Sequence, residues 1–305
     1  MDTISAVIVT FNTGAVVCEC IQRLKASQGD FQLEIIVVDN QSSDNTVTLI
    51  QENFPDSRIL INSENRGFGH ANNRGVEISK GEYVLIVNPD LMVHPEAVAV
   101  LLSVLKDSGI GVVGPKTKES SGEISITARP EYTPGRIAAK YLALDRIFPS
   151  LVYGDARQQA ETVVTPFETD WLQGSCLLMR RSLFDAIGGF DEAFFLYMED
   201  TDLCAQIRDQ GLKVVYVPGA VAIHHGGTTT SRFPLIRVRS YHLSPLIYWR
   251  KRGRKMSVLF LKLVFTLELT LKATGRLLLF PLHRNRRHLL QAKAEIQVIR
   301  NLWGY

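Results

Sequence analysis

Three carboxylates lie close together in the segment Glu199-Asp200-Thr201-Asp202. Repulsion among neighbouring carboxylates raises the pKa of one of them, which suits a group that must accept a proton from a hydroxyl. We therefore interpret Asp200 as a candidate general base. The alternative is that the segment simply begins a helix, whose dipole favours acidic residues in its first turn. That alternative accounts for Asp202 in either case.

A candidate metal ligand follows the apolar run at residues 83–87, where Pro89 stiffens the turn that presents Asp90. A carboxylate is the hard oxygen ligand that Mg²⁺ or Mn²⁺ prefers, and such an ion can bridge it to a phosphate. The sequence has no phosphate-binding lysine loop, which makes metal bridging the natural substitute. His224, which with His225 follows another apolar run, can complete the metal site or contact a diphosphate. The alternative for Asp90 is an ordinary turn residue near a helix N-cap.

Two further segments have the composition of a nucleotide site. Asp39 follows the apolar run at residues 34–38, and its carboxylate can accept the ring N–H of uracil or thymine, or else cap a loop. Residues 65–73 (NRGFGHANN) place glycines and amides before a helix. This pattern allows the backbone to approach a ligand closely, but it also fits a simple turn.

The elements that must position these residues alternate as strand and helix. Apolar, β-branched runs predict parallel strands at residues 4–10, 34–38, 58–62 and 83–87. Helices are predicted between them, at residues 15–26, from 46, at 69–79 and at 95–107. Because open parallel sheets bind ligands beyond the carboxyl ends of their strands, the loops of Asp39 and Asp90 should line one crevice. The predicted fold class is α/β, with a Rossmann-like, mostly parallel sheet flanked by helices.

Charge divides the chain near Ser231. Residues 1–231 contain 18 Lys and Arg against 29 Asp and Glu, a net charge of −11, whereas residues 232–305 contain 16 against 2, a net charge of +14. We predict a catalytic domain at 1–231, with a nucleotide-binding half at about 1–115 and an acceptor-side half at about 116–231. Residues 116–167 show no clear periodicity, and we interpret them as an insertion with a short helix. A basic helical region follows at 232–305.

The basic region predicts an anionic partner. Lys262 and Glu268 interrupt its most apolar stretch, Met256 to Lys272, which favours an amphipathic helix at an interface over one that spans a membrane. We expect it to meet an anionic membrane surface, or to pack on the catalytic domain or in a homodimer. The apolar content disfavours a nucleic-acid-binding arm, and no nucleic acid is expected as a partner.

The cysteines and the N-terminus bear on localisation. The four cysteines have neither the spacing of a zinc site nor the density of a disulfide scaffold, and no signal-peptide pattern opens the chain. We predict a cytoplasmic protein, peripheral at the inner face of the plasma membrane.

Seven segments, in this order, resemble the GT-A fold nucleotide-sugar transferases of glycosyltransferase family 2, especially its rhamnosyltransferase-like branch. They are VIVTFN (7–12), VVDNQSSD (37–44), NRGFGHANNRG (65–75), NPD (88–90), GSCLLMRR (174–181), GGFDEAFFLYMEDTDLC (188–204) and HHGGTT (224–229). The resemblance covers about residues 4–230, and the combination of motifs is highly specific.

The resemblance implies inverting, metal-dependent sugar transfer with Asp200 as the base. It implies that Thr10, Asn12 and Asp39 bind the nucleotide base and ribose. We assign further donor-binding roles to Phe11, Asn65, Gly67, Asn72, Asn88 and Asp90. On the acceptor side the resemblance places Trp171, Gly174, Ser175 and Glu199. Asn88 replaces the first aspartate of the family's Asp-x-Asp metal motif, so His224 becomes a more attractive second ligand beside Asp90.

Processive members of this family carry a Gln-x-x-Arg-Trp motif followed by transmembrane helices, and neither is present here. The expected reaction is therefore the addition of a single sugar to a glycan or lipid-linked saccharide in cell-surface polysaccharide synthesis. The first candidate donor is dTDP-L-rhamnose, ahead of UDP-hexoses and other dTDP-sugars. A nucleotidyltransferase is the competing enzyme class, but it opens with a glycine-rich, arginine-bearing loop where this chain has Phe11-Asn12-Thr13-Gly14.

Overall fold

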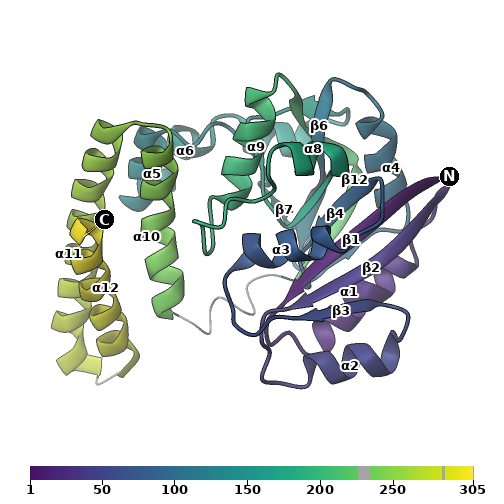
Figure 1. The fold of residues 1–305 in the computed structure, drawn as a ribbon. Helices are drawn as coiled ribbons and strands as arrows, with labels where there is room; N and C mark the ends of the chain where they lie inside the picture. Colours follow the sequence, from purple (N-terminus) through teal and green to yellow (C-terminus); the bar gives the residue numbers. More distant parts are fainter. Residues whose placement is uncertain (226–233, 284–285, 305) are drawn as a thin grey trace. The chain divides into compact units, whose positions relative to one another are not determined.

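A computed structural model describes residues 1–225, 234–283 and 286–304 (Figure 1). The chain forms two compact units. The first comprises Met1–Glu131, Asp155–Phe195 and Glu199–Thr229, and the second comprises Tyr132–Gly154, Leu196–Met198 and Thr230–Tyr305. The domain boundaries predicted from the charge pattern stay a prediction.

The first unit is built on a ten-stranded sheet, in which one half is purely parallel. Its strands lie in the order β3-β2-β1-β4, namely Arg58–Ile61, Phe31–Asp39, Asp2–Thr10 and Tyr83–Val87. The last seven residues of β1 and all five of β4 are buried, which explains their unbroken apolar runs. Thr10 pairs with Asp39 and Ile8 with Val87, so β1, β2 and β4 end at the same edge of the sheet.

The other half of the sheet mixes strand directions. β11 (Cys176–Arg180) runs antiparallel between β4 and β6 (Ile110–Glu119), and β12 (Lys213–His224) is parallel to β6. β5 (Leu91–Val93) pairs antiparallel with the end of β12. The short strands β7 (Ile124–Ser125) and β9 (Phe167–Glu168) pair with β6 and β12, while β8 (Ala128–Arg129) and β10 (Trp171–Leu172) form a separate pair.

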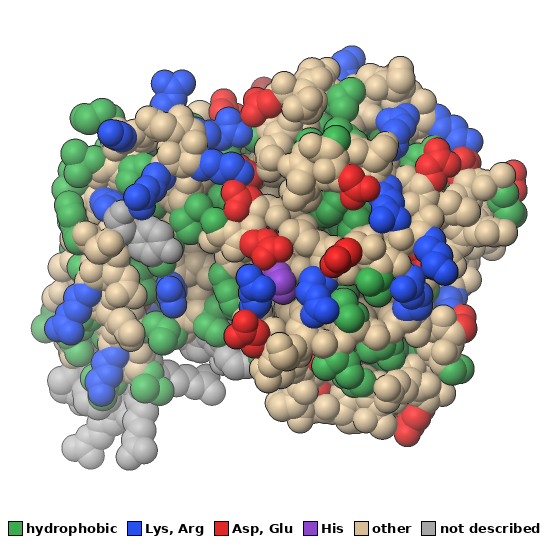
Figure 2. All heavy atoms as spheres, viewed as in Figure 1, with side chains coloured by type: hydrophobic (Ala, Val, Ile, Leu, Met, Phe, Trp, Pro, Cys, Tyr) green, Lys and Arg blue, Asp and Glu red, His purple; other side chains and the backbone are tan. Residues whose placement is uncertain are grey.

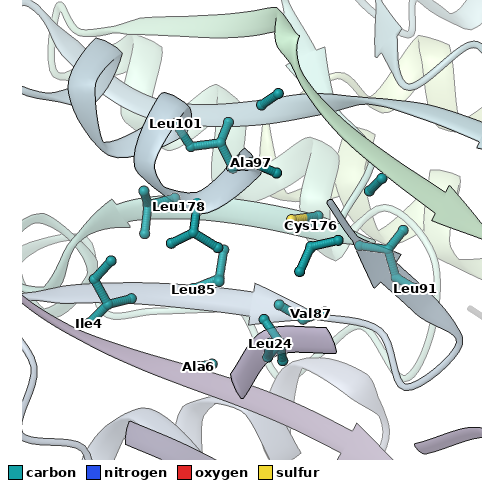
Figure 3. Packing of buried hydrophobic residues seen from close by; sticks show 14 of the residues in the cluster. Ile4, Ala6, Leu24, Leu85, Val87, Leu91, Ala97, Leu101, Cys176 and Leu178 are labelled. Carbon is teal, nitrogen blue, oxygen red and sulfur yellow. The ribbon is translucent and has the colours of Figure 1, made fainter. Parts of the chain in front are cut away.

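Helices cover both faces of this sheet, and each face has its own core. On one face, α1 (Ala15–Lys25), α2 (Thr46–Asn53) and α4 (Ala97–Leu105) pack on the alternate strand residues that include Ile4, Leu85 and Leu178 (Figure 3). On the other face, α3 (Phe68–Glu77), α8 (Arg181–Ala186) and α9 (Glu199–Asp209) pack on their strand neighbours, such as Val7 and Ile86. The predicted α/β class with a mostly parallel, helix-flanked sheet is confirmed.

Residues 116–167 contain more structure than the one short helix expected. They hold the end of β6, the strands β7, β8 and β9, the helices α5 (Pro134–Tyr141), α6 (Ser150–Tyr153) and α7 (Ala156–Thr162), and a 3₁₀ turn at Leu144–Arg146. The Thr133 hydroxyl accepts a hydrogen bond from the Arg136 N–H at 3.3 Å, and Pro134 occupies the first turn, so α5 begins with a regular cap. The elements are short, which is why no periodicity was visible.

The second unit is helical. α10 (Pro234–Lys251), α11 (Lys255–His283) and α12 (Arg286–Gly304) contact one another, and α5 packs on α11. Leu261, Phe265 and Leu269 of α11 are almost completely buried. The predicted C-terminal helical region is therefore present. Within the described residues, no helix reaches the length and apolarity needed to cross a lipid bilayer.

Candidate active site

The carboxylate of Asp39 is buried where β1 and β2 end side by side. The Thr10 hydroxyl donates to its Oδ1 at 2.9 Å, the Ser42 N–H donates to its Oδ2 at 2.8 Å, and the Ser42 hydroxyl donates to Oδ1 at 2.5 Å. These bonds are those of a loop cap. A carboxylate offers about four acceptor positions, so Oδ2 can still accept a donor such as a base N–H. The two readings of Asp39 are therefore compatible.

Asn12 fixes the loop that follows Asp39. Its φ of 54° lies in the left-handed region, where Asn is tolerated better than most residues. Its Oδ1 accepts hydrogen bonds from the Ser43 N–H at 2.8 Å and the Asp44 N–H at 3.3 Å, and its own N–H donates to the Ser42 hydroxyl at 2.9 Å. Half-buried Phe11 lies between Thr10 and Asn12 in the chain. The end of the first strand and the loop after Asp39 are thus connected by hydrogen bonds.

The segment that begins α3 is tied to the same edge. The Gly67 N–H donates to Asn65 Oδ1 at 3.0 Å, and the Gly67 carbonyl accepts from Asn40 Nδ2 at 3.2 Å. Asn72 is fully buried and donates through Nδ2 to the Phe68 carbonyl at 3.0 Å, while its Oδ1 has no partner in the described structure. The predicted residues Asn65, Gly67 and Asn72 therefore lie beside the loop after β2.

Asp90 and His224 meet at 3.1 Å between Oδ1 and Nε2, with their side chains 12% and 14% exposed. The contact arises because β5 pairs with the end of β12, which sets Leu91 opposite His224. Since Asp90 leads into a strand and α4 begins at Ala97, the alternative reading of Asp90 as a helix N-cap residue is wrong. Burial opposes protonation of His224, but the hydrogen bond and charge of Asp90, with the charge of Glu119, raise its pKa above the usual value.

A metal has a pair of candidate protein ligands here. Within residues 1–225, 234–283 and 286–304, no group of three His, Cys, Asp or Glu side chains gathers closely enough to hold an ion by itself. Asn88, which stands where the family has an aspartate, is half-buried two positions before Asp90. Asp90 and His224 supply an oxygen and a nitrogen donor, and a substrate diphosphate can supply others.

Asp200 sits at the start of α9 and accepts hydrogen bonds from three donors. The Gly174 N–H donates to Oδ2 at 2.9 Å, and the N–H and hydroxyl of Thr201 donate to Oδ1 at 2.7 and 3.3 Å. The predicted acceptor-side residue Trp171, three positions before Gly174, is buried, and its Nε1–H donates to the Pro130 carbonyl at 2.9 Å. The Arg129 guanidinium lies 5.4 Å from the centre of the Trp171 ring.

The dipeptide Gly174-Ser175 joins this carboxylate to the turn that contains Asp90. The Gly174 N–H bonds to Asp200, and the carbonyl of the buried Ser175 accepts from the Asn88 N–H at 2.9 Å. The absence of a side chain at Gly174 allows this approach, because a Cβ there would lie in tight contact, 3.2 Å from the Asp200 Cβ. The candidate base and the candidate metal loop are thus held by two consecutive residues.

The two adjacent carboxyls of α9 differ in their environments. Burial raises the pKa of Asp200, against the hydrogen bonds from Gly174 and Thr201 and the positive charge of Arg129. Burial and then the charge of Asp200 raise the pKa of Glu199 well above its usual value, and Glu199 Oε2 has no hydrogen-bond partner in the described structure. Both pKa values are therefore raised, and that of Glu199 is raised more strongly than that of Asp200.

Comparison with known proteins decides the family. The sequence profile described as "Glycosyl transferase family 2" matches residues 5–188, and that of "Glycosyl transferase family group 2" matches residues 136–290. The chain belongs to glycosyl transferase family 2. It is therefore a glycosyltransferase.

The relatives within family 2 include rhamnosyltransferases. The chain is 30% identical over 265 residues to an N-acetylglucosaminyl-diphospho-decaprenol L-rhamnosyltransferase of Mycobacterium tuberculosis (strain H37Rv), covering 82% of this chain and 85% of the relative. It is 28% identical over 200 residues to the rhamnosyltransferase WbbL of Escherichia coli K12, covering 63% of this chain and 72% of the relative. The predicted family and its rhamnosyltransferase-like branch are confirmed.

Solved structures confirm the GT-A fold of this family 2 member. A mannosyltransferase from Pyrobaculum calidifontis, solved with GDP-Man and Mn²⁺, superimposes with a TM-score of 0.55 at 17% identity, covering 99% of this chain and 87% of that one. GalNAc-T7, solved with UDP, GalNAc and Mn²⁺, gives a TM-score of 0.56 at 16% identity, covering 73% of this chain and 43% of that one.

Sequence reasoning missed three residues that hold the loops of the candidate site or affect the charge of Asp200. Asn73 clamps the loop before α9 by accepting from the Phe190 N–H at 2.9 Å and donating to its carbonyl at 2.8 Å. Asn40 connects Gly67 to the end of β2, and Arg129 offsets the burial of Asp200. Asn40 and Asn73 lie inside the motifs that carry the family resemblance, which is the signal that could have found them. Arg129 has no comparable signal.

Proposed function

We propose that this protein transfers one sugar, with inversion, from a nucleoside diphosphate donor to a saccharide or lipid-linked saccharide acceptor. The observation that carries the proposal is the Gly174-Ser175 bridge, which holds Asp200 and the Asn88–Asp90 turn through hydrogen bonds of 2.9 Å each. A proton acceptor for the acceptor hydroxyl and a holder for the donor diphosphate are needed within one site, and this bridge supports that arrangement.

Asp200 is assigned the role of base. It takes the proton of the acceptor hydroxyl while that oxygen forms a bond to the anomeric carbon of the donor. The bond from the anomeric carbon to the diphosphate oxygen breaks on the opposite face, and the nucleoside diphosphate leaves with that electron pair. A single displacement of this kind inverts the anomeric centre. The raised pKa of Asp200 suits it to proton transfer near neutral pH.

Thr10, Phe11, Asn12 and Asp39, with Asn65, Gly67 and Asn72, are assigned to the nucleotide. The free acceptor position on Asp39 Oδ2 supports recognition of a pyrimidine ring N–H, which uracil and thymine share. The rhamnosyltransferase relatives favour dTDP-L-rhamnose as the first candidate donor, ahead of UDP-hexoses and other dTDP-sugars. Trp171, Gly174, Ser175 and Glu199 are assigned to the acceptor side, and cell-surface polysaccharide synthesis is the proposed setting.

A divalent cation, Mg²⁺ or Mn²⁺, fits the chemistry of Asp90 and His224, which present one oxygen and one nitrogen in close, mostly buried positions. Asn88 and the diphosphate oxygens would complete the donor set. When bound, such an ion neutralises charge on the diphosphate and its leaving oxygens. Both solved structures described above hold Mn²⁺, which supports this assignment.

A lipid-linked acceptor would put the reaction at a membrane. The mycobacterial relative is named for a decaprenol-linked substrate, and the basic helical region carries a net charge of +14. We assign the protein to the cytoplasmic face of the plasma membrane as a peripheral protein. Association as a homodimer through the same region is the alternative use of these helices.

The test compares Asp200→Asn with Asp90→Ala. General-base catalysis is worth about 10²- to 10⁴-fold, so Asp200→Asn should lose that much transfer while donor affinity, measured by thermal shift with dTDP-rhamnose, stays near wild type. Asp90→Ala should lose the dependence of donor affinity on Mg²⁺ or Mn²⁺. Equal loss of donor affinity and of transfer in Asp200→Asn would refute its role as base. A wild-type donor affinity that a chelator leaves unchanged would refute metal bridging.

A further inference from the structure

Helix α11 exposes a continuous apolar stripe. Eight large apolar side chains on this helix are between 43% and 77% exposed: Met256, Leu259, Phe260, Leu263, Leu267, Leu271, Leu277 and Leu278. At about 100° of rotation per residue, all of them fall within an arc of roughly 120° on one side of the helix. The other residues within this arc are Thr270 and Thr274, so no charge interrupts the stripe between residues 256 and 278.

The opposite side of α11 already has its partners. Leu261, Phe265 and Leu269 are at most 1% exposed and lie on the side away from the stripe. Phe265 packs against Tyr141 of α5, with ring centres 4.5 Å apart and the ring planes tilted by 35°. The folding of the helical unit therefore does not account for the stripe, and exposed apolar surface of this extent marks an interaction site.

The charge around the stripe is of one sign. Residues 232–305 contain two carboxylates, and both are buried and paired. Glu268 Oε2 lies 3.0 Å from His242 Nε2 and its other oxygen pairs with Lys272, and Glu295 Oε1 lies 2.9 Å from Arg276 Nε. Hence within residues 234–283 and 286–304 the structure shows no exposed carboxylate. The exposed basic residues include Arg250, Lys251, Arg254 and Lys255, beside the start of the stripe.

We propose that the α11 stripe inserts into the boundary between headgroups and acyl chains of an anionic bilayer, with the helix lying in the membrane plane. An apolar face edged by basic residues is the pattern of interfacial helices, which combine buried apolar area with attraction to anionic lipid. A second copy of the chain is the competing occupant, but it would bring two regions of +14 together. This inference rests on the proposed function, because a lipid-linked acceptor lies in such a bilayer.

Flotation on vesicles tests the stripe. The full-length protein is mixed with vesicles of phosphatidylglycerol and phosphatidylcholine, or of phosphatidylcholine alone, and its bound fraction is measured. A triple variant replaces Leu263, Leu267 and Leu271 with Gln. The matched control is Val164→Gln, which removes an apolar side chain that is 82% exposed in the first unit. A second variant, Lys255→Glu with Arg254→Glu, reverses charge without changing the stripe.

Wild type and Val164→Gln should float with the anionic vesicles. The triple variant should bind at least about a hundredfold more weakly, since three leucines no longer enter the apolar layer. The charge-reversal variant should bind weakly too, and wild type should bind phosphatidylcholine poorly. Unimpaired flotation of the triple variant would overturn the proposal. A second result would also overturn the proposal: the wild type does not float and is a dimer, whereas the triple variant is a monomer.

Donor binding separates this proposal from the function on which it depends. Thermal shift with dTDP-rhamnose and with a UDP-hexose should be the same for wild type, Val164→Gln and the triple variant, because the stripe is not part of the donor site. Loss of flotation with intact donor binding supports the membrane surface by itself. Absence of donor binding in every form, with flotation retained, would refute the proposed donors and leave the stripe assignment standing.

Discussion

Replacement of Gly67 by alanine should strongly destabilise the first unit. Gly67 has φ 100° and ψ 177°, a backbone region that is almost exclusive to glycine. A Cβ added there would lie 2.2 Å from the Phe195 carbonyl oxygen, whose partner is the Phe68 N–H at 3.1 Å. The glycine is therefore needed both for its backbone conformation and for the contact between the start of α3 and the loop before α9.

The magnitude follows from these two costs. A non-glycine residue in this backbone region costs about 1–3 kcal/mol, and a steric overlap against backbone costs about 1–3 kcal/mol more. The sum, about 2–6 kcal/mol, is a large part of the 5–15 kcal/mol that usually stabilises a folded protein. The Phe195 carbonyl belongs to the loop that leads towards Asp200. Displacement of this loop by the added methyl group should therefore also reduce the rate of sugar transfer by the molecules that stay folded.

Urea unfolding of Gly67→Ala and Gly122→Ala provides the measurement and its control. Gly122 has φ 87° but nothing within 4 Å of an added Cβ, so its replacement incurs backbone strain without overlap. Gly122→Ala should lose about 1–2 kcal/mol of unfolding free energy and Gly67→Ala distinctly more. Equal losses in the two variants would refute the close approach of Gly67 to Phe195.

Three further predictions concern ionisable groups. Because Asp200 must be ionised to act as a base and burial raises its pKa, the transfer rate should rise with pH through a midpoint above the usual range of an aspartate, as a pH profile of kcat will measure. Glu199→Gln should raise the unfolding free energy at neutral pH, because burial and the charge of Asp200 raise the pKa of Glu199 in the folded protein and so penalise its ionised form. The gain should vanish below the ordinary pKa of glutamate, as urea unfolding at two pH values will show. Glu268→Gln should lower stability by about 1–3 kcal/mol at neutral pH. Burial favours the neutral form of Glu268, but His242 and Lys272 outweigh it and lower the pKa of this carboxyl. The wild type should therefore lose its extra stability over Glu268→Gln as pH falls through that lowered pKa, and the unfolding curves of wild type and variant should converge in acid.

The first half of the sheet could be predicted from sequence because its signals are local. The strands β1, β2 and β4 are buried on both faces and appear as unbroken apolar runs, and the polar residues that end them are the candidate site residues. In the observed order β3-β2-β1-β4, the first three strands follow one another in the chain, and β4 lies on the other side of β1. Asp39 and Asp90 were therefore correctly placed at the ends of strands that share one edge.

The second half depends on contacts between distant residues. β11 lies antiparallel between β4 and β6, an insertion that no local pattern indicates. β12 continues past a register shift between Val217 and Val221 to His224, where it meets β5. The pairing of Asp90 with His224 joins residues separated by 134 positions, and that of Gly174 with Asp200 joins residues separated by 26. The residue types alone identified these side chains as candidates, but their contacts with one another depend on the tertiary fold.

The short segment just before α9 has a strained backbone and belongs to the helical unit. Tyr197 and Met198 have φ values of 67° and 71°, and two such non-glycine residues in succession cost about 1–2 kcal/mol each. The Ser244 hydroxyl donates to the Leu196 carbonyl at 2.8 Å, and the rings of Tyr197 and Tyr241 meet edge to face at 5.7 Å. Such strain persists only where surrounding contacts impose it, and here those contacts come from α10. Leu196, Tyr197 and Met198 belong to the same compact unit as α10, so the contacts that hold this strained backbone lie within the helical unit.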